Sequence, residues 1–261
     1  MSTKLIVSAA LEAGKIAMAY FRNETTDVWY KNGNSPVSQA DHEIDRFLHQ
    51  HLLQHKPDHG WLSEETEDNQ ARLENNRLFI VDPIDGTRGF IKGQSEWCIS
   101  IAIVEQGKPV EGVLHCPALN RTIYASSGEG ILVNGQKHGF DPSSPTRSRP
   151  LVTGSRKLIE TITDLPDQPM DVSAFIPSLA YRLSLVATGE LDGAFARPGA
   201  SEWDIAAADI ILQEAGCCLS DKKGNMLVYN KPEVRSPSLI AANLNRKQEI
   251  LALANSTGIL H

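Results

Sequence analysis

The segment between Ile80 and Gly89 contains the residues best suited to chemistry. It reads I-V-D-P-I-D-G-T-R-G, so two aspartates, Asp82 and Asp85, directly follow an apolar run. That run predicts a buried strand, and Pro83 is expected to end it. Because a proline-initiated turn separates the two aspartates, both carboxylates can face one point, and Gly86 allows a ligand to approach the backbone. An ordinary surface turn is the alternative, since Asp, Pro and Gly are all turn formers.

The same segment could offer a third oxygen donor, because the carbonyl of Ile84 lies between the two aspartates and can turn inward. Hard cations such as Mg²⁺ take oxygen ligands, and they are commonly held by one or two carboxylates together with a substrate phosphate. The pattern therefore indicates a magnesium site.

Acidic residues at two distant positions bear on this interpretation. Glu64 and Glu65 follow the short apolar pair Trp61 and Leu62, and Asp204 stands at the start of an alanine-rich segment that predicts a helix. Taken singly, the glutamates are typical of a solvated acidic face, and Asp204 is typical of a helix cap that the helix dipole stabilises.

Taken together and in this order, the three acidic groups resemble a known family. They are Glu64-Glu65, Asp82-Pro83-Ile84-Asp85-Gly86-Thr87 and Trp203-Asp204, and they resemble the inositol monophosphatase superfamily of Mg²⁺-dependent, lithium-sensitive phosphomonoesterases. The resemblance covers nearly the whole chain. It implies an α+β fold, a five-layer αβαβα sandwich of the inositol monophosphatase and fructose-1,6-bisphosphatase type, with the metal site between two halves.

The resemblance also implies a set of metal ligands. Glu64, Asp82 and the carbonyl of Ile84 would hold a first Mg²⁺, and Asp82, Asp85 and Asp204 would hold a second. Glu64 would also face a third, more hydrated ion. These two to three ions would activate a water molecule and neutralise the alkoxide that leaves during in-line displacement, so no phosphoenzyme is needed.

Two further residues would act on the attacking water. Thr87, hydrogen-bonded to Asp41, matches the family's pair that orients and deprotonates this water, and Glu64 would join them as a catalytic residue. For Asp41 the N-cap of a helix is the alternative, and both roles can coexist. The backbone amides of Gly86 and Thr87 would contact phosphate oxygens if they open a helix, as the family's do.

Two loops resemble the bisphosphate nucleotidase branch of the family, which acts on adenosine 3′,5′-bisphosphate. Lys31 begins a Lys-x-x-x-Ser-Pro stretch like one in that branch, and Phe90-Ile91-Lys92-Gly93 is similar to the corresponding stretch of that branch. Gly89 departs from the pattern, because the branch usually has Glu there.

Two more positions compare with inositol phosphatases. Arg197 stands seven residues before Asp204, where those enzymes place a Glu that binds sugar hydroxyls. A cation suits a second phosphate, although a surface ion pair is the commoner fate of an arginine. Ser178 stands where they contact the ring and could keep that role. Together these positions favour adenosine 3′,5′-bisphosphate as the substrate, with inositol 1-phosphate as the alternative. An alternative of another class is that the protein acts as a partner of the transcription machinery.

Composition agrees with a soluble catalytic domain, and the resemblance implies that its substrate is a small phosphorylated metabolite. The 261 residues carry a net charge of −7, and their Lys and Arg residues are scattered, so no nucleic-acid footprint is visible. Glu12 and Lys15 interrupt the apolar pattern of the first helix, which is therefore neither a signal peptide nor a membrane span. We expect a cytoplasmic protein, and a homodimer is possible because dimers are common in the family.

The order of elements indicates two halves in one compact unit. Residues 1–141 predict two helices and then a meander with an Asn134-Gly135 hairpin, and this half would carry most metal ligands. Residues 142–150, rich in Pro and Ser, would connect it to residues 151–261, where strands and helices alternate and Asp204 closes the site. Helices are expected over about 41–54, 179–188, 204–215 and 246–254.

Overall fold

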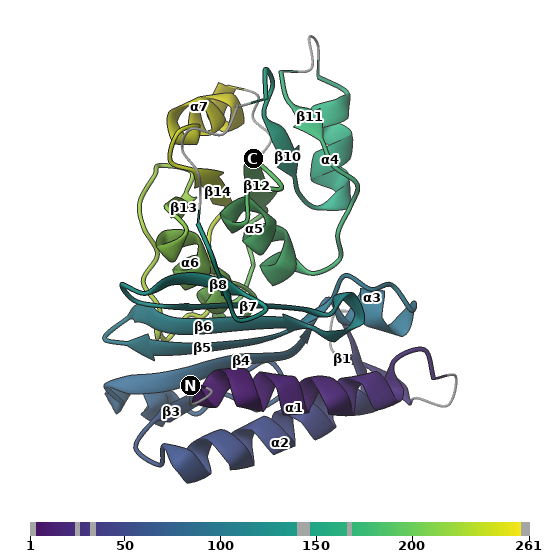
Figure 1. The fold of residues 1–261 in the computed structure, drawn as a ribbon, viewed down its shortest axis with the longest axis vertical. Helices are drawn as coiled ribbons and strands as arrows, with labels where there is room; N and C mark the ends of the chain where they lie inside the picture. The colour runs from purple at the N-terminus through teal and green to yellow at the C-terminus, as the bar shows by residue number, and fades with distance from the viewer. Residues whose placement is uncertain (1–3, 24–26, 32–34, 140–146, 166–168, 257–261) are drawn as a thin grey trace.

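The chain forms five alternating layers of helices and sheets in a computed structural model, which describes residues 4–23, 27–31, 35–139, 147–165 and 169–256 (Figure 1). Helices α1 and α2 cover one face of a large sheet, and α5 and α6 lie between this sheet and a smaller one. Helices α4 and α7 cover the outer face of the smaller sheet (Figure 1). The expected α+β sandwich is confirmed. The helices are α1 (Leu5–Tyr20), α2 (Gln39–His55), α3 (Thr87–Ile91), α4 (Arg156–Thr163), α5 (Leu179–Ala187), α6 (Glu202–Glu214) and α7 (Lys247–Ser256), with 3₁₀ turns η1 (Gln70–Glu74) and η2 (Pro117–Leu119).

The large sheet has seven strands in the order β3-β4-β5-β6-β7-β8-β9, with β3 parallel to β4 and the remaining pairs antiparallel. The smaller sheet has the order β11-β10-β12-β14-β13, and β1 pairs with β2 separately. The strands are β1 (Val28–Lys31), β2 (Ser35–Ser38), β3 (Gly60–Ser63), β4 (Arg77–Asp85), β5 (Cys98–Glu105), β6 (Lys108–Cys116), β7 (Arg121–Ser126), β8 (Gly130–Val133), β9 (Gln136–His138), β10 (Leu151–Thr153), β11 (Asp171–Val172), β12 (Gly193–Ala196), β13 (Cys217–Asp221) and β14 (Leu239–Asn243).

Alternation along the strands explains why both faces of each sheet are covered. In β4, Phe79 and Val81 pack against α1 and α2, whereas Leu78 and Ile80 pack in the cluster of α5 and α6. A strand buried on both faces reads as a continuous apolar run, which is why the sequence predicts it. Helix α6 lies between two sheets, so it is apolar on nearly every side.

Most expected elements are observed. The four helices expected in the sequence lie within two residues of α2, α5, α6 and α7 at each end. The hairpin between β8 and β9 turns at Asn134 and Gly135, whose φ angles are 51° and 77°, so this prediction is also confirmed. The division into two halves stays a prediction, and residues 140–146 of the expected connection lie outside the described residues. No described helix is both long enough and apolar enough to cross a bilayer.

The expectation that Pro83 ends its strand is wrong. Strand β4 continues to Asp85, and its pairing with β5 shifts register between Asp82 and Asp85. Proline, which lacks an N–H donor, is tolerated at such an irregularity because regular ladder bonds are interrupted there. The shift gives both aspartates a place at the end of the same buried strand.

The close approach of α6 to β6 at Gly112 gives a test of this packing. A Cβ added there would lie 2.5 Å from Ile210 Cγ2 and 2.7 Å from the Ala207 carbonyl oxygen. We therefore expect Gly112→Ala to lower the free energy of unfolding by about 1–3 kcal/mol in urea denaturation. Gly139→Ala, where the added Cβ meets open space, is the control and should change it by less than about 0.5 kcal/mol. Equal effects of the two substitutions would contradict the close contact.

Candidate active site

Three carboxylates from distant parts of the chain meet at one point. Glu64 follows β3, Asp82 lies in β4 and Asp204 lies in the first turn of α6; each offers an oxygen, and these oxygens lie within 4.8 Å of one another. They border a cavity of about 170 Å³ whose other lining residues are Asp85, Gly86, Thr87, Arg88 and Pro177. A larger cavity of about 390 Å³ lies beside Phe90 and Lys92, but its described lining includes no carboxylate.

The end of β4 is fixed by hydrogen bonds to its own aspartates. Asp82 Oδ1 accepts from the Ile84 amide at 3.0 Å. Asp85 Oδ2 accepts from the Ala180 amide at 2.7 Å and from the Ser178 hydroxyl. Gly86 follows with φ of 94°, and a Cβ there would lie 3.2 Å from the backbone of Ser178. Glycine is therefore required at this turn.

Ser178 lies behind a carboxylate instead of facing open space. It is fully buried, and its hydroxyl both donates to Asp85 and accepts from the Tyr181 amide at 3.0 Å as the cap of α5. The contact with substrate inferred from the sequence stays a prediction. The observed hydrogen bonds show a different task, because they hold Asp85 in place.

Asp41 and Asp204 occupy equivalent positions in two helices, and neither is the N-cap that the sequence suggested. The caps are Ser38 and Ser201, and each aspartate is the third helical residue of a capping box. Asp41 Oδ2 accepts from the Ser38 amide at 2.8 Å, and Asp204 Oδ2 accepts from the Ser201 amide at 2.7 Å. The sequence signal was present in the two Ser-x-x-Asp patterns. In each capping box, one oxygen of the aspartate accepts the hydrogen bond from the cap amide, which the helix itself leaves without an acceptor.

Thr87 connects Asp41 with the end of β4. Its hydroxyl lies 2.9 Å from the Ile84 carbonyl oxygen and 3.4 Å from Asp41 Oδ1. Because the hydroxyl has one proton, it donates to one of these acceptors at a time. The chain therefore places a hydroxyl, a carboxylate and a backbone carbonyl together beside the cavity.

Burial and mutual repulsion disfavour the charges in this cluster. Burial, together with the charges of Glu64, Asp85 and Asp204, raises the pKa of Asp82 well above its usual range. Burial and the neighbouring Asp85 raise the pKa of Asp204 to about 8. Burial also raises the pKa of Asp85, although the bonds from Ser178 and Ala180 act in the opposite direction. A cluster of oxygen donors that repel one another fits a bound divalent cation, which would compensate the charges.

Two residues expected to bind substrate do not appear in the described lining of this cavity. Lys31 ends β1, and its side chain lies outside the described residues. Arg197 follows β12 and is half-buried; its Nε is buried without a hydrogen-bond partner in the described part of the chain, and it is absent from the described cavity lining. Sequence reasoning missed Arg88 and Pro177, which do border the cavity.

Comparison with known proteins identifies the class. The profile of the inositol monophosphatase family matches residues 2–257, so the chain belongs to this family, and it is a phosphoric monoester hydrolase. An inositol monophosphatase of Thermotoga maritima has a similar structure, with a TM-score of 0.83, 27% identity and coverage of 97% of this chain and 96% of that chain.

Curated relatives have different names at similar identity. A histidinol-phosphatase of Chlorobaculum parvum is 29% identical, covering 95% of each chain. Nus factor SuhB of Pasteurella multocida is 28% identical, covering 95% of this chain and 96% of its own. The 3′(2′),5′-bisphosphate nucleotidase CysQ of Aggregatibacter actinomycetemcomitans is 30% identical, covering 87% of each. The identities differ too little to select a substrate.

Because Asp204→Asn removes one charge from the carboxylate cluster, we expect it to stabilise the metal-free protein and to weaken the stabilisation that Mg²⁺ gives. Asparagine keeps the capping oxygen and removes a charge, so in EDTA at about pH 9 the variant should melt a few degrees above the unsubstituted protein. This advantage should shrink as the pH falls through about 8, because the folded state then protonates Asp204. Added Mg²⁺ should raise the melting temperature of the unsubstituted protein more than that of the variant. Equal stabilisation of both proteins by Mg²⁺ would contradict a ligand role.

Proposed function

We propose that this protein is a Mg²⁺-dependent, lithium-sensitive phosphomonoesterase that uses water to hydrolyse a small phosphorylated metabolite. The observation that carries the proposal is the meeting of Glu64, Asp82 and Asp204 within 4.8 Å at a cavity, in a chain of the inositol monophosphatase family. Thr87 and Gly86 border the same cavity, so a phosphate there would meet the end of β4.

The proposed ligands are the residues that the sequence indicated. Glu64, Asp82 and the Ile84 carbonyl would hold one ion, Asp82, Asp85 and Asp204 another, and Glu64 a third. Bound Mg²⁺ supplies a Lewis acid that favours ionisation of water and stabilises charge on the leaving oxygen. Four carboxylates border the cavity, those of Glu64, Asp82, Asp85 and Asp204, and carboxylate oxygens are donors that Mg²⁺ prefers.

Thr87 and Asp41 would handle the proton of the attacking water. If the Thr87 hydroxyl donates to Asp41 Oδ1, its oxygen lone pairs are left to accept a hydrogen bond from water. The Ser38 amide and hydroxyl hold Asp41 Oδ2 at 2.8 Å and 2.6 Å, so a proton passed on through Thr87 would go to Oδ1. The pair thus orients water and accepts its proton as a general base does.

The proposed substrate is adenosine 3′,5′-bisphosphate, with inositol 1-phosphate as the alternative. The nucleotidase-like loop at Phe90 to Gly93 and the cationic Arg197 support the bisphosphate. Ser178, committed to Asp85, lends no support to an inositol ring contact. A third possibility is histidinol phosphate, since one relative at 29% identity has that activity in its name.

A role with the transcription machinery is a second candidate, because one relative is a Nus factor. A pure binding protein has no need of intact metal ligands, whereas this chain keeps Glu64, Asp82, Asp85, Thr87 and Asp204. We therefore propose that any such contact accompanies catalysis. Homodimerisation and a cytoplasmic location also stay predictions.

A phosphate-release panel tests the activity. Purified protein with Mg²⁺ should release phosphate from at least one of adenosine 3′,5′-bisphosphate, inositol 1-phosphate, fructose 1,6-bisphosphate and histidinol phosphate. EDTA should abolish the release, because the proposed ligands need a hard cation to act, and lithium should inhibit it. Full turnover in excess EDTA after removal of residual metal would rule out the mechanism.

Arg197 separates the two substrate proposals. If its guanidinium binds a second phosphate, a charge-assisted pair worth about 1.5–3 kcal/mol is lost in Arg197→Ala, and kcat/KM for the nucleotide should fall about ten- to a hundredfold. Activity on monophosphates should change little. Arg197→Glu should further raise the ratio of inositol phosphate to nucleotide activity, because it repels the second phosphate. Equal losses on both substrates in steady-state assays would make Arg197 a structural residue.

A further inference from the structure

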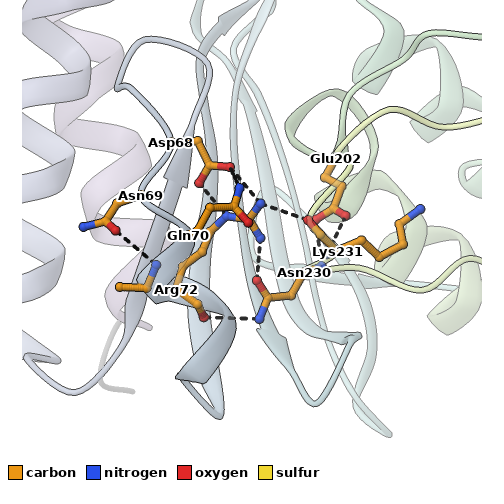
Figure 2. Close-up of polar contacts among 8 residues, drawn as sticks. Asp68, Asn69, Gln70, Arg72, Glu202, Asn230 and Lys231 are labelled. Carbon is orange, nitrogen blue, oxygen red and sulfur yellow. Dashed lines mark hydrogen bonds and ion pairs between the residues drawn. The ribbon is translucent and has the colours of Figure 1, made fainter.

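A buried arginine lies between the two segments that carry Glu64 and Asp204. Arg72 belongs to the short turn η1, and its side chain is only 1% exposed. Its guanidinium donates to both carboxylate oxygens of Asp68, from Nε to Oδ1 at 2.7 Å and from Nη2 to Oδ2 at 2.9 Å (Figure 2). A buried charge needs such partners, because an unpaired one would carry a large desolvation penalty. For the nearby Glu64 and Glu65 the sequence had suggested a solvated acidic face.

The same guanidinium reaches a distant loop. Its Nη1 donates to Asn230 Oδ1 at 2.7 Å, and Nη2 donates to the Lys231 carbonyl at 2.9 Å. Asn230 Nδ2 in turn donates to the Arg72 carbonyl at 3.3 Å, so the contact is reciprocal (Figure 2). Arg72 thereby joins residues 158 positions apart in sequence.

The loop is tied to the start of α6. The amides of Asn230 and Lys231 donate to the two carboxylate oxygens of Glu202 at 2.8 Å and 3.2 Å (Figure 2). Glu202 is the first residue of α6 and is 1% exposed, and its own amide donates to the Val234 carbonyl at 3.0 Å. Asp204 follows in the same first helical turn. The loop therefore fixes the end of α6 that presents this carboxylate.

The segment that carries Glu64 is fixed at both ends. On one side, Asp45 of α2 accepts hydrogen bonds from Ser63 and, at 2.6 Å, from Thr66. On the other side, Asp68 is held by Arg72. Glu64 thus lies in a short stretch whose distal end is coupled through Arg72 to the helix of Asp204.

We infer that Arg72 is a positioning residue that sets the separation of Glu64 and Asp204 and thereby tunes the affinity of the site for Mg²⁺. The inference rests on the proposed function, because it takes these carboxylates as metal ligands. Residues that hydrogen-bond to metal ligands typically change the metal affinity 10- to 100-fold when they are replaced. Arg72 acts on Glu64 and Asp204 through the segments that it joins, so we expect an effect near the lower end of this range. If Arg72 had only a structural role, its replacement would change the stability of the protein and leave its affinity for Mg²⁺ unchanged.

Calorimetric titration of metal-free protein with Mg²⁺ tests the inference. Arg72→Met fills similar space without the hydrogen bonds, and we expect it to raise the Kd for Mg²⁺ about tenfold or more. In phosphate-release assays the half-saturating Mg²⁺ concentration should rise likewise, with kcat largely recovered at saturating Mg²⁺. Arg72→Lys keeps the charge but loses the forked geometry, so its Kd for Mg²⁺ should lie between those of the unsubstituted protein and Arg72→Met.

Arg77→Met is the matched control, because Arg77 makes an exposed ion pair with Glu105 at 3.0 Å on the same strand as Asp82. It should leave the Kd for Mg²⁺ unchanged. A folded Arg72→Met protein with an unchanged Kd would overturn the inference.

A second variant covers the case in which Arg72→Met does not fold. Asn230 has φ of 56°, so Asn230→Gly keeps the backbone bonds to Glu202 without strain and removes only the side chain that Arg72 binds. We expect this variant to raise the Kd for Mg²⁺ severalfold, and an unchanged Kd would overturn the inference. Absence of Mg²⁺ binding by the unsubstituted protein, or equal binding by Asp204→Asn, would instead overturn the proposed function.

Discussion

Repulsion among buried carboxylates is the constraint on which the rest of the structure depends. Asp82 and Asp85 lie at the end of one strand, Glu64 and Asp204 join them, and burial raises the pKa of all three aspartates. A fold can hold such groups together only if rigid elements force them into place. The five layers do so, because Asp82 lies near the end of a strand buried on both faces and Asp204 lies in the first turn of a helix packed between two sheets.

One local device is used twice to meet this constraint. Helices α2 and α6 both begin with Ser-x-x-Asp, and in each the aspartate binds its own cap with one oxygen. The helix start thus fixes the rotamer of the side chain, which can present its second oxygen elsewhere. Asp45, one turn after Asp41 on α2, holds Ser63 and Thr66 around Glu64. At Asp41 and Asp204, the hydrogen bonds that cap the helix therefore also position the carboxylate.

The sequence predicted what depends on local periodicity. The buried β4, the amphipathic α2 and the Asn134-Gly135 hairpin each follow from neighbouring residues, so their prediction needed no tertiary contacts. The course of β4 past Pro83 was missed, because the bulge depends on pairing with β5. The contacts of Arg72 with Asn230 could not be foreseen either, since nothing local indicates that residues 158 positions apart would meet. In the candidate site, the acidic residues could be predicted from the sequence, but the positions of Arg88 and Pro177 at the cavity could not.

The residues of the carboxylate cluster are more tightly constrained than those around the cavity, and this explains why the sequence predicts the reaction class more readily than the substrate. The carboxylates and Thr87 are constrained by repulsion, capping and strand geometry, so few residue types satisfy their positions. The surroundings of the cavity are less constrained: Ser178 is occupied by Asp85, and Arg197 stands apart from the described lining. Residues on such walls can change without disturbing the carboxylate cluster. Relatives with different substrates in their names can accordingly share one scaffold at nearly equal identity to this chain.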